Sequence, residues 1–320
     1  MLRVLLTTTS FQDTTGAHQD LLAAQAFEVL RERGPLPERR MLELAGQFDA
    51  FLCGDDEITA AVLDKARPRL QVISKYGVGL DKIDLVACTL RGVPVLYTPG
   101  VNHATVAEHS FCLLLALARR LIDCVEGVRA GEWKRLTGHE LFGKRIGIVG
   151  LGRIGQEVAR RAVAFGMQVH ALTPHWPESF ARETKIEQHQ TIASLLPEMD
   201  VVSLHTGLTN ETRHLLNGER FAQMKPGALL VNTARAELVD LPALLHALAT
   251  GNLGGYGTDV LEAEPPPPDH PLLRHPRVIV TPHIGSRTFE SVPRQAMRAL
   301  LNLINFLKGD PDIIQANKIA

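Results

Sequence analysis

The sequence has little net charge and no block of like charges. Its 320 residues carry a formal net charge of −1 at pH 7, and no run of Lys and Arg is longer than two residues. No overall field therefore attracts nucleic acid or an anionic membrane surface, and neither is expected as a partner.

Long apolar runs are also missing. The longest, Phe111 to Ala118, has eight residues, whereas a membrane-spanning helix needs about 20. The first residues, MLRVLLTTTSF, become polar too soon for a secretory signal peptide and predict a first strand instead. We therefore expect a cytoplasmic protein.

Cysteines are few and scattered. The sequence has four of them and no C-x-x-C pair. Each one falls in an apolar strand or helix pattern, which predicts buried free thiols in a reducing cytoplasm. Because no metal-ligand spacing is present, we expect no metal site. The four residues are Cys53, Cys88, Cys112 and Cys124.

The first hundred residues alternate between strand and helix patterns. Strands are predicted at 2–7, 48–53, 70–74 and 93–96, and helices at about 17–33, 37–45, 59–66 and 85–90. Such alternation predicts a parallel sheet with its own core. This part has no phosphate-binding fingerprint, so we expect a second α/β unit beside a nucleotide-binding one.

Two loops in this part are candidate ligand sites. The run Lys75-Tyr76-Gly77-Val78-Gly79 directly follows a predicted strand, where free backbone amides can hold a carboxylate. A tight turn without a ligand is the alternative. Residues 98–103 (TPGVNH) indicate a linker between domains, and His103 in it is more typical of a helix cap or the surface than of catalysis.

Residues 104–130 have a helical pattern that is apolar on more than one face. Such a helix is buried, either within its own domain or by a partner subunit. We favour an arm that holds a homodimer together, and burial within one chain remains the alternative.

The stretch from Arg145 to Gly166 is the strongest local signal. A short apolar strand leads into Gly150, Gly152 and Gly155, spaced as G-x-G-x-x-G, and a helical pattern follows. The glycines permit a tight turn, close approach of the backbone to phosphate, and close packing of helix on strand. A dinucleotide pyrophosphate at the helix N-terminus is therefore predicted, with a plain turn as the alternative.

The next strand, 168–172, ends at Thr173 rather than at an acidic residue. An Asp or Glu there would bind the ribose hydroxyls of NAD. Without it a 2′-phosphate meets no like-charge repulsion, and His175 and Arg153 could attract it. NAD, NADP or dual use is therefore expected.

Further strands are predicted at 200–205, 229–232, 255–259 and 278–281, and a last helix at about 290–307. Arg235, Glu264 and His283 each follow the end of one of these strands. In a doubly wound sheet these ends line one crevice. Together the three groups suit hydride transfer to a keto acid, because a guanidinium binds a carboxylate and an imidazole paired with a carboxylate exchanges a proton. Taken singly, Arg235 is equally compatible with a surface cation, Glu264 in a proline-rich loop is more typical of a solvated group, and Asp259 is compatible with a strand-end turn residue.

Motifs across nearly the whole chain resemble the D-isomer-specific 2-hydroxyacid dehydrogenase family. They are KYGVGLDKID (75–84), VAEH (106–109), GEW (131–133), GLGRIG (150–155), NTARAELVD (232–240), TDVLEAEPP (258–266) and TPHIG (281–285). The resemblance implies an α/β fold with two doubly wound parallel sheets. A Rossmann NAD(P)-binding domain (101–289) would be inserted into a flavodoxin-like substrate domain (1–100 and 290–320).

The resemblance also implies roles for individual residues. Arg235 would bind the substrate, His283 would be the acid/base and Glu264 its partner. Asp259 would contact the nicotinamide amide, and the amides of Val78 and Gly79 would hold the substrate carboxylate. The cofactor-binding set is Gly150, Gly152, Arg153, Ile154, Gly155, Thr173, His205, Thr206, Thr212, Thr233, Ala234, Asp259 and Gly285. The substrate-binding set is Lys75, Tyr76, Gly77, Val78, Gly79 and Asn102.

The implied activity is reduction of a small 2-keto acid or its reverse, in the 3-phosphoglycerate, glycerate or glycolate class, by a homodimer joined through the nucleotide-binding domains. Ala236 stands where the family has Gly, so a local change in the loop is expected, and no regulatory domain is expected after the last helix. We hypothesise that Lys75 reaches a distal anionic group such as a phosphate. A dinucleotide-sensing binding protein resembling the C-terminal-binding corepressors is the alternative from another class.

Overall fold

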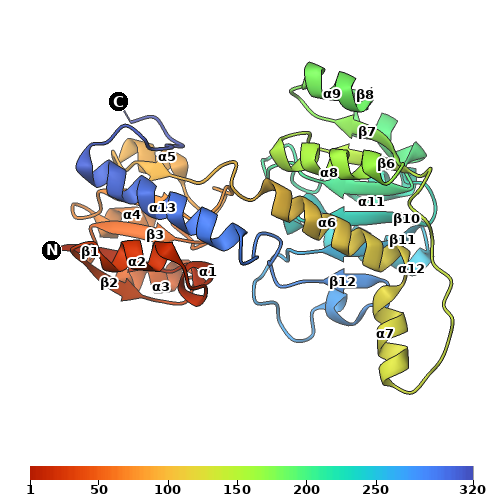
Figure 1. Cartoon of the computed structure of the whole chain (residues 1–320), viewed down its shortest axis with the longest axis horizontal. Coiled ribbons are helices and arrows are strands. Elements are labelled where there is room, and N and C mark those ends of the chain that lie inside the picture. The colour runs from red at the N-terminus through yellow and green to blue at the C-terminus, as the bar shows by residue number, and fades with distance from the viewer. Residues whose placement is uncertain (320) are drawn as a thin grey trace. The chain divides into compact units, whose positions relative to one another are not determined.

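The computed structural model describes residues 1–319, which form two compact units (Figure 1). Unit 1 comprises residues 1–102 and the chain from Arg287 onward, and unit 2 is His103–Ser286. Unit 1 is thus discontinuous in sequence, with unit 2 inserted between its two parts.

Unit 1 is built on a parallel sheet of five strands in the order β2-β1-β3-β4-β5. Numbered along the chain, this is the 2-1-3-4-5 order of flavodoxin-like folds. The strands are β1 (Leu2–Leu6), β2 (Phe27–Arg31), β3 (Ala50–Cys53), β4 (Val72–Lys75) and β5 (Val95–Leu96). The helices are α1 (Thr9–Asp13), α2 (Ala17–Ala23), α3 (Glu38–Leu44), α4 (Ala60–Ala66), α5 (Leu85–Leu90) and α13 (Ser291–Lys308).

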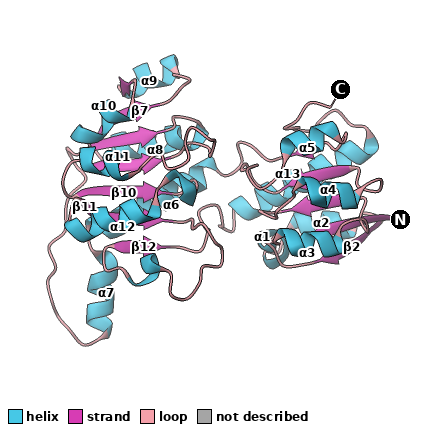
Figure 2. Cartoon of the chain, turned by 180° about the vertical axis from the view of Figure 1, so that it is seen from behind, coloured by secondary structure: helices cyan, strands magenta, loops and turns pink. Residues whose placement is uncertain are grey.

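Helices cover both faces of this sheet, as Figures 1 and 2 show from opposite sides. On one face Val4, Leu52 and Val72 pack against Ala296 and Leu300 of α13. The other face packs against α3, α4 and α5. Successive residues of a strand point to opposite faces, so near-continuous apolar strands are what a sheet covered on both sides requires.

Unit 2 contains a seven-stranded sheet in the order β12-β11-β10-β9-β6-β7-β8, with every pair parallel. Numbered within the unit, the order of its first six strands is the 3-2-1-4-5-6 of a Rossmann fold. The predicted fold class is therefore confirmed. The strands are β6 (Arg145–Val149), β7 (Gln168–Leu172), β8 (Glu187–His189), β9 (Val201–Leu204), β10 (Ala228–Asn232), β11 (Leu253–Thr258) and β12 (Val278–Val280).

Two separate cores flank this sheet. Residues of α6, α8 and α9 pack on one face, and residues of α10, α11 and α12 on the other (Figures 1 and 2). The helices are α6 (His103–Ala118), α7 (Leu121–Arg129), α8 (Arg153–Ala164), α9 (Glu178–Thr184), α10 (Ile192–Leu195), α11 (Gly218–Gln223) and α12 (Leu241–Thr250). Sequence patterns did not indicate α9, β8, α10 or α11.

The helix predicted at 17–33 is wrong beyond Ala23. The chain forms α2 and then the edge strand β2, in which Leu2 of β1 pairs with Phe27. Phe27 and Val29 are half-buried while Glu28 is exposed. This period of two suits a strand that is covered on one side, and pairing with β1 overrides the weaker helical spacing.

The single helix predicted at 104–130 is also wrong. It breaks between α6 and α7 at Arg120, which has φ of 51°. The carbonyl of Ala118 accepts the amide of His139 (2.7 Å), and a Cβ on Gly138 would lie 2.6 Å from that same oxygen. The close approach of residues 138–139 therefore takes the place that a further helical turn would fill. Because α6 packs within unit 2, the predicted dimer arm can apply only to α7.

The cysteine prediction holds for two of the four residues. Cys53 and Cys88 are buried, whereas Cys124 is half-buried and Cys112 is exposed; all four are free thiols. Cys112 lies on α6 at a position that faces away from the core, which an apolar run could not reveal. In residues 1–319 no helix is long and apolar enough to cross a membrane, and no cluster of three or more His, Cys, Asp or Glu residues suits a metal ion.

Candidate active site

The glycine turn joins β6 to α8. Gly150 has φ of +97°, and a Cβ on it would lie 2.6 Å from the backbone of His205. A Cβ on Gly155 would overlap the carbonyl oxygen of Gly150, whereas the Cβ position of Gly152 has no atom within 4 Å. The first and third glycines are thus required by packing, and the second leaves open backbone at the N-terminus of α8. This geometry fits a dinucleotide pyrophosphate.

The end of β7 lacks an acidic side chain, as the sequence predicts. Thr173 is half-buried, and its hydroxyl donates to the carbonyl of His175 (3.4 Å). His175 itself is exposed, as is Arg153 at the first position of α8. Among the described residues, 173–176 carry no carboxylate that would repel a 2′-phosphate.

At the end of β9 a neutral imidazole lies beside the glycine turn. His205 Nε2 is 2.7 Å from Ser203 Oγ, and burial lowers the pKa of His205 to about 3. Its buried Nδ1 has no hydrogen-bond partner among the described residues. A bound cofactor hydroxyl could satisfy such an atom. The next residue, Thr206, is half-buried and begins a loop. Within this loop the Thr212 hydroxyl donates to the carbonyl of Gly207 (2.8 Å) and stabilises the loop conformation.

A buried asparagine shapes the loop after β10. Asn232 accepts the amide of Ala234 (3.0 Å) and donates to the carbonyl of Arg235 (2.8 Å). These bonds fold residues 233–235 over the strand end and fix where the Arg235 side chain begins. Ala236 starts a short 3₁₀ turn and is not in the left-handed region. Alanine in place of the family glycine therefore fits this loop without backbone strain.

His283 and Glu264 lie in direct contact. His283 Nδ1 is 2.7 Å from Glu264 Oε2, and Glu264 Oε1 accepts the amide of Leu261 (3.0 Å). An ionised carboxylate can only accept, so Nδ1 carries a proton and Nε2 is the nitrogen that can exchange one with a substrate. The backbone of His283 has φ of 52°, a strained conformation of the kind that is found at functional sites.

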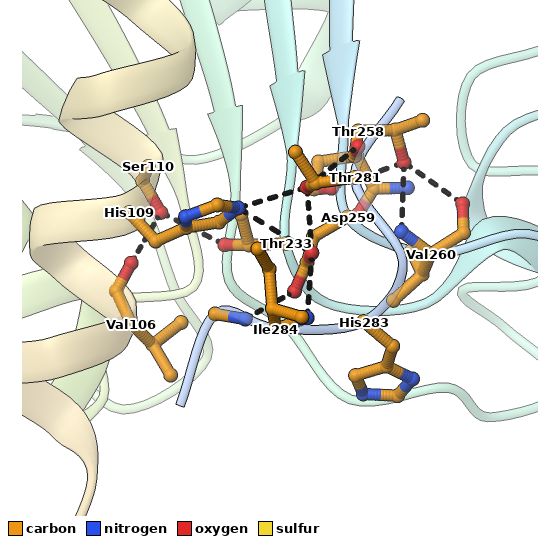
Figure 3. A network of polar contacts seen from close by, with 12 residues as sticks. Val106, His109, Ser110, Thr233, Thr258, Asp259, Val260, Thr281, His283 and Ile284 are labelled. Atoms are coloured by element: carbon orange, nitrogen blue, oxygen red, sulfur yellow. Dashed lines mark hydrogen bonds and ion pairs between the residues drawn. The ribbon is translucent and has the colours of Figure 1, made fainter. Parts of the chain in front are cut away.

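Asp259 organises the segment that carries His283 (Figure 3). Its carboxylate accepts the amides of Ile284 (2.9 Å) and Gly285 (2.7 Å) and the hydroxyl of Thr281 (2.6 Å). Burial alone raises the pKa of Asp259, but hydrogen bonds from His109, Thr281 and Ile284 outweigh it and hold that pKa below its usual value. A Cβ on Gly285 would lie 2.8 Å from Asp259 Oδ2, so any larger residue there would displace this carboxylate.

The predicted substrate loop of unit 1 follows β4. Gly77 has φ of +121° and is pinned to Thr98, whose Oγ1 accepts its amide (2.9 Å). No hydrogen bond joins the amides of Val78 or Gly79 to another described residue, so these amides suit an anionic ligand. Tyr76 is buried, and its burial raises the pKa of its hydroxyl above the usual value. Asn102 is also buried, at the end of this part of unit 1.

Lys75 has a different environment from the one expected of a phosphate ligand. Its side chain is 2% exposed, and its Nζ donates to Asp55 Oδ1 (2.6 Å) and to the carbonyl of Gly54. A second carboxyl, that of Asp56, is buried nearby and accepts the amides of Leu36 and Gly54. The charge of Lys75 is therefore balanced within unit 1.

Sequence reasoning assigned no role to two residues of α6: His109, the last residue of the VAEH segment, and Ser110, which follows it. His109 Nε2 lies 2.8 Å from Thr281 Oγ1 and 3.3 Å from Asp259 Oδ1, and Ser110 Oγ lies 2.8 Å from Thr233 Oγ1. The available signal was a run of three polar residues, Glu108, His109 and Ser110, in a largely apolar helix. Without the fold it did not indicate which strand ends His109 and Ser110 would reach.

The strand order of unit 2 and the geometry of its glycine turn define the class: a Rossmann dinucleotide-binding protein. A sequence model of the NAD-binding domain of D-isomer-specific 2-hydroxyacid dehydrogenases matches residues 111–285. The chain is 43% identical over 295 residues to a glyoxylate reductase of Thermofilum pendens, covering 89% of this chain and 86% of that protein. The chain therefore belongs to the D-isomer-specific 2-hydroxyacid dehydrogenase family.

Other relatives support the same membership. A D-3-phosphoglycerate dehydrogenase of Bacillus subtilis is 40% identical over 266 residues, which are 82% of this chain but 50% of that protein. The solved D-lactate dehydrogenase of Aquifex aeolicus, in complex with NAD and lactic acid, has a TM-score of 0.86 at 30% identity and covers 96% of both chains. Membership makes this chain an oxidoreductase that binds a nicotinamide cofactor and acts on a CH–OH group.

Proposed function

We propose that this protein reduces a small 2-keto acid to a D-2-hydroxy acid, or catalyses the reverse reaction, with His283 as the acid/base. The observation that carries the proposal is the 2.7 Å contact between His283 Nδ1 and Glu264 Oε2 at the edge of the sheet that carries the glycine turn. A carboxylate on Nδ1 fixes the tautomer and stabilises the imidazolium that protonates a carbonyl oxygen.

In this proposal each residue of the site has a separate role in catalysis or substrate binding. His283 Nε2 gives its proton to the substrate carbonyl oxygen in reduction and takes it back in oxidation. The Arg235 guanidinium holds the substrate carboxylate by two hydrogen bonds, which fixes the orientation of the substrate. The amides of Val78 and Gly79 in unit 1 remain a predicted binding site for an anionic group. The nicotinamide supplies the hydride when it is bound.

For the cofactor, Gly150, Gly152 and Gly155 hold the pyrophosphate on the N-terminus of α8, flanked by Arg153 and Ile154. Asp259 Oδ2 accepts one amide at 2.7 Å and has a second lone pair for the nicotinamide carboxamide. Because Thr173 carries no charge, we propose that the enzyme accepts NADP as well as NAD. The remaining proposed cofactor contacts are His205, Thr206, Thr212, Thr233, Ala234 and Gly285.

We propose an unphosphorylated substrate of the glyoxylate or hydroxypyruvate class. The Lys75 ammonium is buried and paired with Asp55, so binding a substrate phosphate there would break an existing ion pair. The relative from Thermofilum pendens, named a glyoxylate reductase, supports this choice. Recognition of a phosphate by Lys75 stays a prediction that the substrate panel below can test.

We further propose a cytoplasmic homodimer in which a second copy of this chain covers α7. No described residue of α7 is buried, and its Leu121, Ile122, Val125 and Val128 are 38% to 52% exposed. Four large apolar side chains on one exposed helix are typical of a surface that is covered by a partner. The four free thiols are compatible with a reducing compartment.

A panel of glyoxylate, hydroxypyruvate, phosphohydroxypyruvate and pyruvate, assayed with NADH and with NADPH, tests this function. We expect turnover of the first two with both coenzymes and poor turnover of the phosphorylated acid. A hundredfold preference for NADH would refute dual use. If Lys75→Ala selectively raises KM for phosphohydroxypyruvate, Lys75 does bind a phosphate. The dinucleotide-sensing alternative is not favoured, since the relatives are named as enzymes, but absence of turnover with the whole panel would restore it.

A further inference from the structure

Two consecutive residues of α6 reach the ends of three neighbouring strands (Figure 3). His109 Nε2 contacts Thr281 Oγ1, after β12, at 2.8 Å and Asp259 Oδ1, after β11, at 3.3 Å. Ser110 Oγ contacts Thr233 Oγ1, after β10, at 2.8 Å. All of these residues belong to unit 2. The loops that carry Arg235, Glu264 and His283 all begin at these strand ends.

The direction of the hydrogen bonds around His109 follows from counting protons. Thr281 has one hydroxyl proton, and the ionised carboxylate of Asp259, 2.6 Å away, can only accept. The Thr281 hydroxyl therefore donates to Asp259 rather than to the carbonyl of Thr258, which is 3.4 Å away. Its oxygen must then accept from His109, so Nε2 of His109 carries a proton. The chain of donation runs from His109 through Thr281 to Asp259.

Asp259 also holds the backbone around His283 by hydrogen bonds. Its carboxylate accepts the amides of Ile284 and Gly285, and its own carbonyl accepts the amide of His283 (3.0 Å). Three consecutive amides thus contact Asp259, and the His283 amide is shared with the carbonyl of Thr281, also at 3.0 Å. These bonds surround the residue that has the strained φ of 52°, a conformation that persists only where the surrounding structure supports it.

The side chain of Asp259 is 3% exposed and that of His109 is 15% exposed. If His109 no longer donates, the buried negative charge of Asp259 loses part of its compensation. The hydrogen bonds that Asp259 makes with its other partners then change as well. A displaced Asp259 would carry the His283 backbone with it.

We propose that His109 is a positioning residue for His283, acting through Thr281 and Asp259. It lies on α6, outside the proposed acid/base pair, and it fixes the Asp259 carboxylate to which the amides of Ile284 and Gly285 donate. This inference rests on the proposed reductase function.

The test compares His109→Leu, which removes the donor, with His109→Gln, whose amide nitrogen can donate in its place. Glu108→Gln is the matched control, because Glu108 is the adjacent residue, 66% exposed, and pairs with Arg161. With glyoxylate we expect His109→Leu to lower kcat at least tenfold. His109→Gln should recover kcat to within about threefold of the value of the unaltered protein. The control Glu108→Gln should have the same kcat as the unaltered protein.

Hydrogen exchange provides a readout that does not depend on activity. The amides of Ile284 and Gly285 should exchange at least tenfold faster in His109→Leu than in the unaltered protein, but not in His109→Gln. Thr281→Val breaks the same chain one step further on and should reproduce the effect if His109→Leu does not fold. Unchanged exchange and unchanged kcat in both broken variants would overturn the inference, as would a His109→Gln variant as slow as His109→Leu. Absence of turnover by the unaltered protein would instead refute the proposed function, and exchange would still test the anchor.

Discussion

Replacing single glycines in the turn after β6 should separate its structural role from its cofactor role. In Gly155→Ala the new methyl would lie about 1 Å inside the 3.0 Å limit that real Cβ contacts keep, and the atom it meets is the carbonyl oxygen of Gly150. That oxygen belongs to a backbone turn, so relief requires α8 to move away from β6. Overpacking of this kind costs about 1–3 kcal/mol, and the rigid neighbour favours the upper end.

The expected readout follows from the size of unit 2. For a domain of 150–250 residues, about 3 kcal/mol corresponds to a Tm lower by roughly 6–12 °C. Gly152→Ala is the matched control, because its Cβ would meet no atom within 4 Å and its φ of −76° suits alanine. We expect its Tm to stay within about 2 °C of that of the unaltered protein, since the cost should stay within about 0.5 kcal/mol.

Cofactor binding should be weakened in Gly152→Ala although its Tm is unchanged, because the new methyl occupies the space that a pyrophosphate needs. Calorimetric Kd values for NADH should rise at least tenfold in this variant although its fold is intact. Differential scanning calorimetry supplies the Tm values. If Gly155→Ala melts within 1 °C of the unaltered protein, the close-packing argument is wrong, and if Gly152→Ala binds NADH normally, the phosphate does not lie on this turn.

Three further outcomes are expected. His283→Ala should lower kcat with glyoxylate by about 10² to 10⁴, the usual contribution of a general acid or base; a loss under tenfold would refute that role. Val125→Glu on α7 should convert a dimer to a monomer in light scattering after gel filtration, whereas a monomeric unaltered protein would refute the dimer. His205 is held neutral, with its pKa lowered by burial to about 3 from an ordinary value of about 6.5. As the pH falls, the His205 ring therefore takes up a proton in the unfolded state before it does so in the folded state. The contribution of His205 to stability is complete above about pH 6.5 and is lost as the pH drops toward 3. His205→Gln should flatten that fall in Tm, and an unchanged slope between pH 6.5 and 4 would contradict it.

The elements that could be predicted have signals contained in a few adjacent residues. The apolar run of β6, the glycines after it and the helical spacing of α8 specify a strand, a turn and a helix without reference to the rest of the chain. Likewise, a parallel sheet brings strand ends to one edge, so Glu264 and His283 could be expected in the same region before their 2.7 Å contact was known.

The elements that could not be predicted depend on distant partners. Ala26, Val29 and Leu30 fit a helical face, whereas Phe27 and Val29 fit a strand, and only pairing with β1 decides between the two patterns. The break after α6 depends on Gly138, which packs against Ala118 from twenty residues further along the chain. His109 is equally invisible, because its partners Asp259 and Thr281 lie far along the sequence.

The ribosome delivers α13 only after the whole of unit 2. The five strands of unit 1 are complete at Leu96, but the helix that covers one face of their sheet begins only at Ser291. Roughly 190 residues lie between them, and at about 5–20 residues per second their synthesis takes on the order of 10–40 s. During that time Val4, Leu52 and Val72 lack the helix that buries them in the finished protein. Unit 2, contiguous in sequence, can complete its fold within this interval, so unit 1, whose strands are made before unit 2, becomes stable after it.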